Sequence, residues 1–302
     1  MRIASYSAGG WPKLGLVTDE NRVVDLADLD PWFPSTMRGL LELPGGLEKL
    51  ADRAPEPGQG VAVEDVEFLP VVPDPRAIWC AALTFNSHVT EAPGREAPDY
   101  PLFFPRVAES QTGHRQPLIQ PTVSEMLDYE GELAVVIGSR ARHVPVADAL
   151  SHVAGYSCYN EASVRDWQRH TPQIAPGKNF EATGGFGPWL VTPDEFGDPY
   201  GHRITTRVNG EVRQDASIDE LLFRIEYLIH YVSTMHSLLP GDVIVCGTPG
   251  GVGMRMDPPV FLHSGDLVTV EIDGIGVLEN PVLAESPETP PTWSSVNKEL
   301  AK

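Results

Sequence analysis

The segment LDYEGELAVVIG at residues 127–138 constrains the fold more than any other part of the chain. Its second half is apolar and rich in β-branched residues, which predicts a buried strand. Alternate side chains of a strand share one face, so Asp128, Glu130 and Glu132 are expected to project together. An exposed edge strand whose acids are merely solvated would also satisfy this pattern.

The three acids of this segment suggest a metal site. Carboxylates beside a buried segment repel one another and lose hydration, and a bound divalent cation is the simplest compensation for both effects. Carboxylate oxygens suit hard ions such as Mg²⁺, Mn²⁺ or Ca²⁺ better than zinc. The segment is therefore interpreted either as a metal site or as a solvated acidic edge.

The charge balance argues against anionic partners. The chain has 22 Lys and Arg residues against 42 Asp and Glu residues, which gives a formal net charge of −20. Such a surface repels nucleic acid and anionic membranes. No apolar run reaches the roughly 18–20 residues of a membrane helix, and the N-terminus lacks the apolar core of a signal peptide. We therefore expect a cytoplasmic protein without nucleic-acid or membrane partners.

Proline-rich stretches at residues 54–60 and 70–75 divide the chain. Such stretches are typical of linkers, so we expect a small N-terminal α/β domain over residues 1–70. A strand-rich domain is expected over residues 71–285. The stretch 286–302 is rich in Pro, Ser, Thr and charge, which predicts a flexible tail. The predicted fold class is α+β with strands predominating.

One long helix is predicted in the second half of the chain. Ser217 and Glu220 form a Ser-x-x-Glu capping box, an apolar periodicity follows, and Pro240-Gly241 would end the helix. Four residues of this periodicity form a stripe that is predicted to be core: Leu221, Ile225, Leu228 and Val232.

Glu161 has two interpretations. It follows the apolar stretch 153–159, where a helix is predicted to start, and the helix dipole favours an acid in the first turn. Arg165, four residues further on, would then pair with Glu161 on the helix surface. Alternatively, Glu161 provides a third oxygen ligand beside Glu130 and Glu132.

A series of motifs follows a characteristic order along the chain. They are LTFNSHVTE at 83–91, DYEGELAVVIG at 128–138, SVRDWQ at 163–168, GKNF at 177–180, GFGPW at 185–189, RVNGE at 207–211, PGDVI at 240–244 and GTPGGVG at 247–253. Over residues 75–283 these motifs resemble the fumarylacetoacetate hydrolase superfamily, in its acylpyruvase-like branch. The resemblance implies a mixed β-roll or barrel-like catalytic core behind a small N-terminal domain. It also implies a homodimer.

The resemblance implies one Mg²⁺ or Mn²⁺ ion held by Glu130, Glu132 and Glu161. Many members carry Asp at the last position, where this chain has Glu. The extra methylene moves the carboxylate oxygens by about 1.5 Å, as ordinary bond lengths require. The ion would then be held differently, or through a water molecule.

Further residues match the catalytic positions of the family. His88 and Glu91 match a pair on a lid, three residues apart on one helical face, where the carboxylate fixes the imidazole tautomer. A histidine held in this way can take a proton from water near neutral pH. Lys178 would lie beside the metal and polarise a substrate oxygen, as its family counterpart does. Without the resemblance these would be surface residues of no special role.

The substrate would be bound by residues from separate motifs. Gln168 matches a substrate-contacting amide, and Arg106 would pair with a substrate carboxylate bidentately. Thr248 would donate its hydroxyl and backbone N–H groups to the same carboxylate. Phe85, where the family motif usually has tyrosine, is assigned to the substrate site.

The activity implied by the resemblance is cleavage of the C–C bond of a 2,4-diketo acid of the acylpyruvate or fumarylpyruvate type, as in aromatic catabolism. The products would be pyruvate and a carboxylic acid. Decarboxylation of a 2-oxo diacid such as oxaloacetate, an isomerase of the 5-carboxymethyl-2-hydroxymuconate type, and a non-catalytic binding protein are the alternatives. The chain has no Gly-x-Ser-x-Gly elbow and no His-Glu-x-x-His motif, which argues against serine hydrolases and zinc enzymes.

Overall fold

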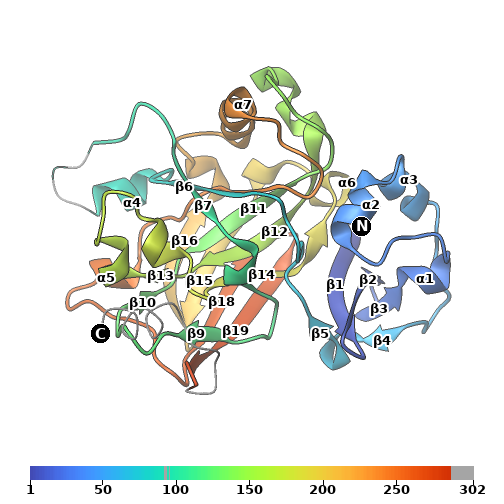
Figure 1. Ribbon diagram of the computed structural model, residues 1–302, viewed down its shortest axis with the longest axis horizontal. Coiled ribbons are helices and arrows are strands. Elements are labelled where there is room, and N and C mark those ends of the chain that lie inside the picture. Colours follow the sequence, from blue (N-terminus) through green and yellow to red (C-terminus); the bar gives the residue numbers. More distant parts are fainter. Residues whose placement is uncertain (92–93, 95, 287–302) are drawn as a thin grey trace, which may run out of the picture.

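Two β-sheets form the framework of the protein (Figure 1). The computed structural model describes residues 1–91, 94 and 96–286. The larger sheet has 12 strands. Its strands, in spatial order, are β4 (Val61–Ala62), β3 (Arg22–Asp25), β2 (Trp11–Val17), β1 (Arg2–Ala8), β14 (Gly184–Val191), β12 (Val153–Glu161), β11 (Gly131–Ile137), β17 (Val243–Val245), β6 (Ile78–Ala82) and β7 (Leu102–Arg106), with β5 (Glu67–Phe68) beside β1 and β8 (Gln111–Thr112) beside β14.

A second sheet of five strands packs against the first. Its strands, in spatial order, are β16 (Glu211–Ser217), β15 (Arg203–Val208), β18 (Leu267–Ile272), β19 (Gly276–Ala284) and β9 (Leu118–Gln120). The short strands β10 (Leu127–Asp128) and β13 (Ser163–Val164) pair with each other beside the two sheets. The α-helices are α1 (Leu26–Leu29), α2 (Met37–Glu42), α3 (Gly46–Ala51), α4 (Asn86–Thr90), α5 (Arg165–Gln168), α6 (Pro193–Phe196) and α7 (Ile225–Met235).

Short 3₁₀ helices make many of the connections between these elements. They are η1 (Val63–Asp65), η2 (Ala108–Ser110), η3 (Val146–His152), η4 (Ala175–Lys178), η5 (Pro199–Gly201), η6 (Ile218–Glu220) and η7 (Gly253–Arg255). Two of them carry residues of the site described below, because η4 ends at Lys178 and η7 ends at Arg255.

Strand β11 is buried on both faces, as its apolar run predicts. Leu133 and Val135 face a core shared with β18 and α7, whereas Ala134 and Val136 face a second core shared with α2. A strand covered on both faces has no polar side, which explains its nearly continuous apolar sequence. The strand forms the centre of the larger sheet, where β12 and β17 flank it.

The fold is strand-rich α+β, as expected, but the strands do not close into a barrel. Among the described residues the larger sheet keeps β4 and β7 as free ends, and the smaller one keeps β16 and β9. Pro105 in β7 removes a backbone donor from that edge, which limits pairing with another strand. The barrel-like closure implied by the resemblance is therefore replaced by two open, packed sheets.

The N-terminal segment is joined to the rest of the chain by hydrogen bonds. Strand β1 pairs with β14 through Arg2 opposite Val191 and Ile3 opposite Leu190. The two predicted domains therefore share one continuous sheet, whose N-terminal strands lie at the right of Figure 1. The tail predicted over 286–302 lies outside the described residues, apart from Ser286.

The predicted long helix is shorter than its sequence pattern. The capping box of Ser217 and Glu220 is present, but it begins the 3₁₀ turn η6. Leu221 then adopts an extended conformation and forms a β-bridge with Phe85, so the chain cannot continue as a helix. Helix α7 begins only at Ile225 and ends at Met235. The predicted apolar stripe is buried throughout.

We expect Leu228→Ala to destabilise the protein strongly. Leu228 is fully buried in α7, within a core that also contains residues of both sheets, and such truncations cost about 2–5 kcal/mol of unfolding free energy. Met235→Ala on the same helix is the matched control, because Met235 is 49% exposed. Urea unfolding followed by circular dichroism measures both. Equal losses in the two variants would contradict the assigned core.

Candidate metal centre and active site

Three buried glutamates meet where β11 and β12 lie side by side. Glu132 belongs to β11, Glu161 is the last residue of β12, and Glu130 immediately precedes β11. The strands pair with Gly131 opposite Asn160. Each glutamate offers a carboxylate oxygen, and these oxygens lie within 4.8 Å of one another. The interpretation of the acidic segment as a solvated edge strand is therefore excluded, because these acids are buried.

One local prediction for this region is wrong. Glu161 ends a strand, so neither a helix dipole nor a pairing with Arg165 accounts for it. Asp128 lies outside the group of three glutamates, although Arg165 bonds both Asp128 and Glu130. The Asp128 carboxylate instead accepts hydrogen bonds from the backbone N–H groups of Gly253, at 2.8 Å, and Met254, at 3.0 Å.

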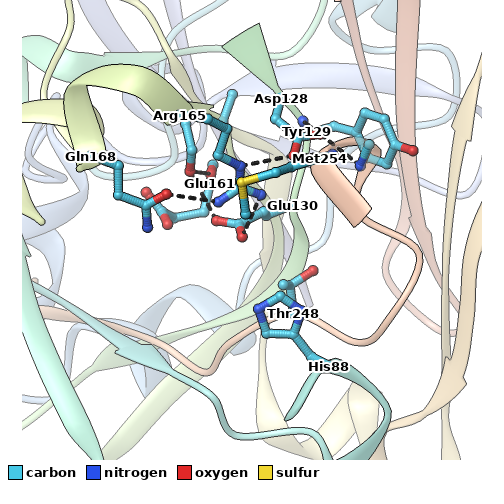
Figure 2. Close-up of polar contacts among 12 residues, drawn as sticks. His88, Asp128, Tyr129, Glu130, Glu161, Arg165, Gln168, Thr248 and Met254 are labelled. Carbon is cyan, nitrogen blue, oxygen red and sulfur yellow. Dashed lines mark hydrogen bonds and ion pairs between the residues drawn. The ribbon is translucent and has the colours of Figure 1, made fainter. Parts of the chain in front are cut away.

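Buried cations compensate most of the acids (Figure 2). Arg165 donates to Asp128 and to Glu130, each at 2.8 Å. Lys178 donates to Glu130 at 2.5 Å and also to Glu161. The buried charged side chains of this cluster are the acids Asp128, Glu130, Glu132 and Glu161 and the bases Arg106, Arg165 and Lys178.

Glu132 is the acid that no cation compensates. Among the described residues its carboxylate receives only the backbone N–H of Gly247, at 2.5 Å. Burial and the carboxylates of Glu161 and Glu130 raise the pKa of Glu132 well above its usual range. By contrast, although burial opposes charge on Glu130, Arg165 and Lys178 hold the pKa of that carboxyl well below its usual range.

These residues fit a divalent cation. Three carboxylates converge, and one of them lacks a counter-charge in a place where an isolated buried charge is costly. Oxygen donors of this kind are the ligands that Mg²⁺ and Mn²⁺ prefer. Glu130, Glu132 and Glu161 would hold the ion, as the sequence predicts.

Lys178 remains an ammonium ion beside this cluster. Burial opposes its charge, but Glu130 and Glu161 outweigh that effect and raise the pKa of Lys178 above its usual value. Its third donor reaches the hydroxyl of Ser163 at 2.6 Å. Lys178 can therefore stabilise negative charge, but it is not available as a base.

His88 and Glu91 form the predicted pair. His88 lies in α4, and its Nδ1 is 2.8 Å from Glu91 Oε2. The other oxygen of Glu91 accepts the backbone N–H of Gly251 at 2.5 Å, which ties α4 to the glycine-rich loop. Figure 2 shows His88 and Thr248 on the opposite side of an open space from Glu130 and Glu161.

That space is a cavity of about 130 Å³. Its polar wall includes the three glutamates, Lys178, His88, Gln168 and Thr248, and its apolar wall includes Leu83, Leu102, Phe104, Ile174 and Met254. The Thr248 hydroxyl is engaged, because it donates to Gly131 O at 2.9 Å and accepts from Gln214 at 2.7 Å. A cavity of this size and polarity suits a small organic acid.

Two residues assigned to the substrate site do not line this cavity. Arg106 is buried and donates to Glu161, Ser110, Thr183 and the carbonyl of Ala162. It supports Glu161 and has no donor directed at a ligand. Phe85 is 2% exposed and packs in the core between the sheets. Its aromatic character in the motif is thus explained by packing.

Other residues that contribute to the site were not identified from the sequence. Arg165 lies in the SVRDWQ motif, but its pairing with Asp128 and Glu130 depends on the pairing of β10 with β13, which brings two distant segments together. Met254 and Arg255 line the cavity from η7, directly after the glycine-rich motif. The only signal for them in the sequence is that proximity.

The family model for the fumarylacetoacetate (FAA) hydrolase C-terminal domain matches residues 77–283. The chain therefore belongs to the fumarylacetoacetate hydrolase family, as its motifs indicate. A human protein named as a mitochondrial oxaloacetate tautomerase is 39% identical over 276 residues, which cover 90% of this chain and 88% of the relative.

Solved structures agree with this assignment. A fumarylacetoacetate hydrolase from Exiguobacterium antarcticum has a TM-score of 0.79 and 31% identity, covering 94% of this chain and 100% of that one. A maleylpyruvate hydrolase from Sphingobium sp. SYK-6, solved with manganese (II) and pyruvate, has a TM-score of 0.74 and 26% identity, covering 95% and 100%. In the described part of the chain, no helix is long and apolar enough to cross a membrane.

We expect Glu132→Gln to weaken divalent-ion binding without destabilising the ion-free protein. Glutamine can still accept the Gly247 N–H, whereas the uncompensated buried charge disappears. Titration calorimetry with Mn²⁺ should show at least about a tenfold loss of affinity, or about 1.4 kcal/mol. Mn²⁺ should raise the melting temperature of the wild type more than that of the variant.

Asp242→Asn is the control for this experiment. Asp242 is a buried acid outside the cluster that caps the backbone N–H groups of Ala77 and Leu239. Its substitution should leave Mn²⁺ affinity unchanged. If Glu132→Gln bound Mn²⁺ with wild-type affinity, the assignment of the metal site to the three glutamates would be contradicted.

Proposed function

We propose that the protein catalyses the keto–enol interconversion of a 2-oxo acid of the oxaloacetate type, with Mg²⁺ or Mn²⁺ bound by Glu130, Glu132 and Glu161. The observation that carries this proposal is a tautomer-fixed histidine facing three buried carboxylates across a small cavity. The human relative named as an oxaloacetate tautomerase supports the choice of reaction.

The bound cation would polarise the 2-oxo group and stabilise negative charge that develops on its oxygen. The protein's own residues supply the proton transfer. The Glu91 carboxylate only accepts hydrogen bonds, so His88 Nδ1 carries the hydrogen and Nε2 is left as the basic nitrogen. Nε2 would take a proton from the carbon next to the 2-oxo group, and the imidazolium would return a proton to the oxygen.

Gln168 would orient the substrate, and Lys178 would stabilise the negative charge that develops on it. The Lys178 ammonium is a fixed positive charge against the acidic cluster and favours a developing oxyanion. Arg165 donates to Gln168 Oε1 at 3.1 Å. A guanidinium has donors only, so the amide oxygen must face Arg165 and the NH₂ group is left to donate to a ligand.

Cleavage of a 2,4-diketo acid is the second candidate, and the same histidine favours it. His88 Nε2 would take a proton from water, whose oxygen attacks the distal carbonyl. The C–C bond then breaks, its electron pair leaves with the 2-oxo fragment as the enolate of pyruvate, and the His88 imidazolium would return its proton to that fragment. The related fold of a maleylpyruvate hydrolase supports this candidate.

Dimerisation, a role in aromatic catabolism and the cytoplasmic location stay predictions. The human relative is named as mitochondrial.

We expect oxaloacetate keto–enol interconversion, followed by enol absorbance, to require Mg²⁺ or Mn²⁺ and to stop in excess chelator. His88→Asn should lower kcat by about 10²- to 10⁴-fold, the usual contribution of a general base. His263→Asn is the control, because that side chain is 58% exposed and does not line the cavity. Undiminished turnover in chelator would contradict the metal-dependent scheme. Pyruvate release from acetylpyruvate without enol interconversion would favour the second candidate.

A further inference from the structure

Arg255 is unusual in this acidic protein because its guanidinium has no partner among the described residues. Acids outnumber bases by 42 to 22, and most described arginines and lysines have an acidic or carbonyl partner. Within the described residues, neither a hydrogen bond nor an ion pair engages the Arg255 guanidinium, although Arg255 is one of the residues that line the cavity containing the glutamates. Arg115 is the other described arginine of this kind, and it lies outside that cavity.

The backbone that carries Arg255 is held firmly. Asp128, which is fully buried, accepts the N–H groups of Gly253 and Met254. Val260 N donates to Gly253 O at 3.0 Å, and a Cβ at Gly253 would overlap the Val260 carbonyl oxygen. Arg255 N donates to Val252 O at 3.0 Å. The position of this arginine at the cavity wall is therefore fixed by its own turn rather than by a partner for its charge.

The charges of the cavity are divided between its depth and its mouth. The carboxylates are buried, and cationic side chains or the proposed metal ion engage them. Arg255 is exposed to solvent and follows Met254, which Figure 2 shows beside the acidic cluster. A ligand whose keto-acid end meets the ion would thus approach a free guanidinium with its other end. Such a guanidinium suits a carboxylate, which it can bind bidentately.

We propose that Arg255 selects dicarboxylic over monocarboxylic 2-oxo acids by pairing with the distal carboxylate of the substrate. This inference rests on the proposed function, because it takes the keto-acid end to be bound at the glutamates. It also gives a reason for a strongly acidic protein to accept a dianion, since its overall charge of −20 would otherwise repel one.

A matched pair of unreactive ligands tests the inference by binding alone. Malate and 2-hydroxybutanoate share the chelating 2-hydroxy acid and differ only in the distal group, a carboxylate or a methyl. Titration calorimetry on the Mn²⁺-loaded wild type should show tighter binding of malate, by about fivefold to tenfold, since solvent screens a pair at the cavity mouth. Arg255→Met should abolish this preference by weakening malate binding alone, and Arg255→Lys should retain part of it.

Arg140→Met is the control for the change in net charge. Arg140 is exposed and bonds Ser237 away from the cavity, so this variant should keep the full preference. An equal preference in Arg255→Met and wild type, or no preference in the wild type, would overturn the inference.

Turnover of oxaloacetate by the same proteins separates this inference from the proposed function. Wild-type turnover with a KM that Arg255→Met does not change would overturn the role of Arg255 and leave the proposed function in place. An Arg255-dependent preference for malate without turnover would support the inference and overturn the proposed function.

Discussion

Burial of an excess carboxylate is the constraint on which the site depends. Asp128, Glu130 and Glu161 obtain their counter-charges from Arg165, Lys178 and Arg106. Glu132 obtains none within the described residues, and yet it is only 3% exposed, on a strand of the larger sheet, where it lines the cavity. An uncompensated charge in such a place is expensive unless an ion or a proton neutralises it. The rest of the site holds the carboxylates in positions where such an ion can be bound.

The double-sided core provides this support. Because β11 is covered by one core on each face, its position relative to β12 is fixed by packing as well as by hydrogen bonds. The carboxylates therefore converge without relying on flexible loops. Rigid support of this kind keeps ligand atoms in place for an ion. The N-terminal strands extend the same sheet, and α2 packs in the core on the face of β11 that carries Ala134 and Val136.

Much of this was predictable from sequence because the signals were local or occurred in ordered motifs. The predictions of the buried strand, the convergent glutamates and the His88–Glu91 pair depend on short-range periodicity and on family motifs. The failures depended on contacts between distant segments. Helix α7 starts late because Leu221 bridges to Phe85, and Arg106 turns inward because Glu161 ends a strand beside it. Nothing local to those residues indicates either contact.

The glycine-rich loop and the turn after it contact several separate parts of the site. Gly247 N donates to Glu132, and Gly251 N donates to Glu91. Asp128 accepts from Gly253 N and so anchors the turn that carries Arg255. The three glutamates proposed to bind the ion lie on strands or directly before one, whereas the arginine proposed to bind the far end of a ligand lies on this one stretch. Exchange of residues 252–260 as a cassette would therefore redesign which acids are accepted and leave the ion-binding strands untouched. Substrate preference can diverge within the family in the same way, through changes in this segment alone.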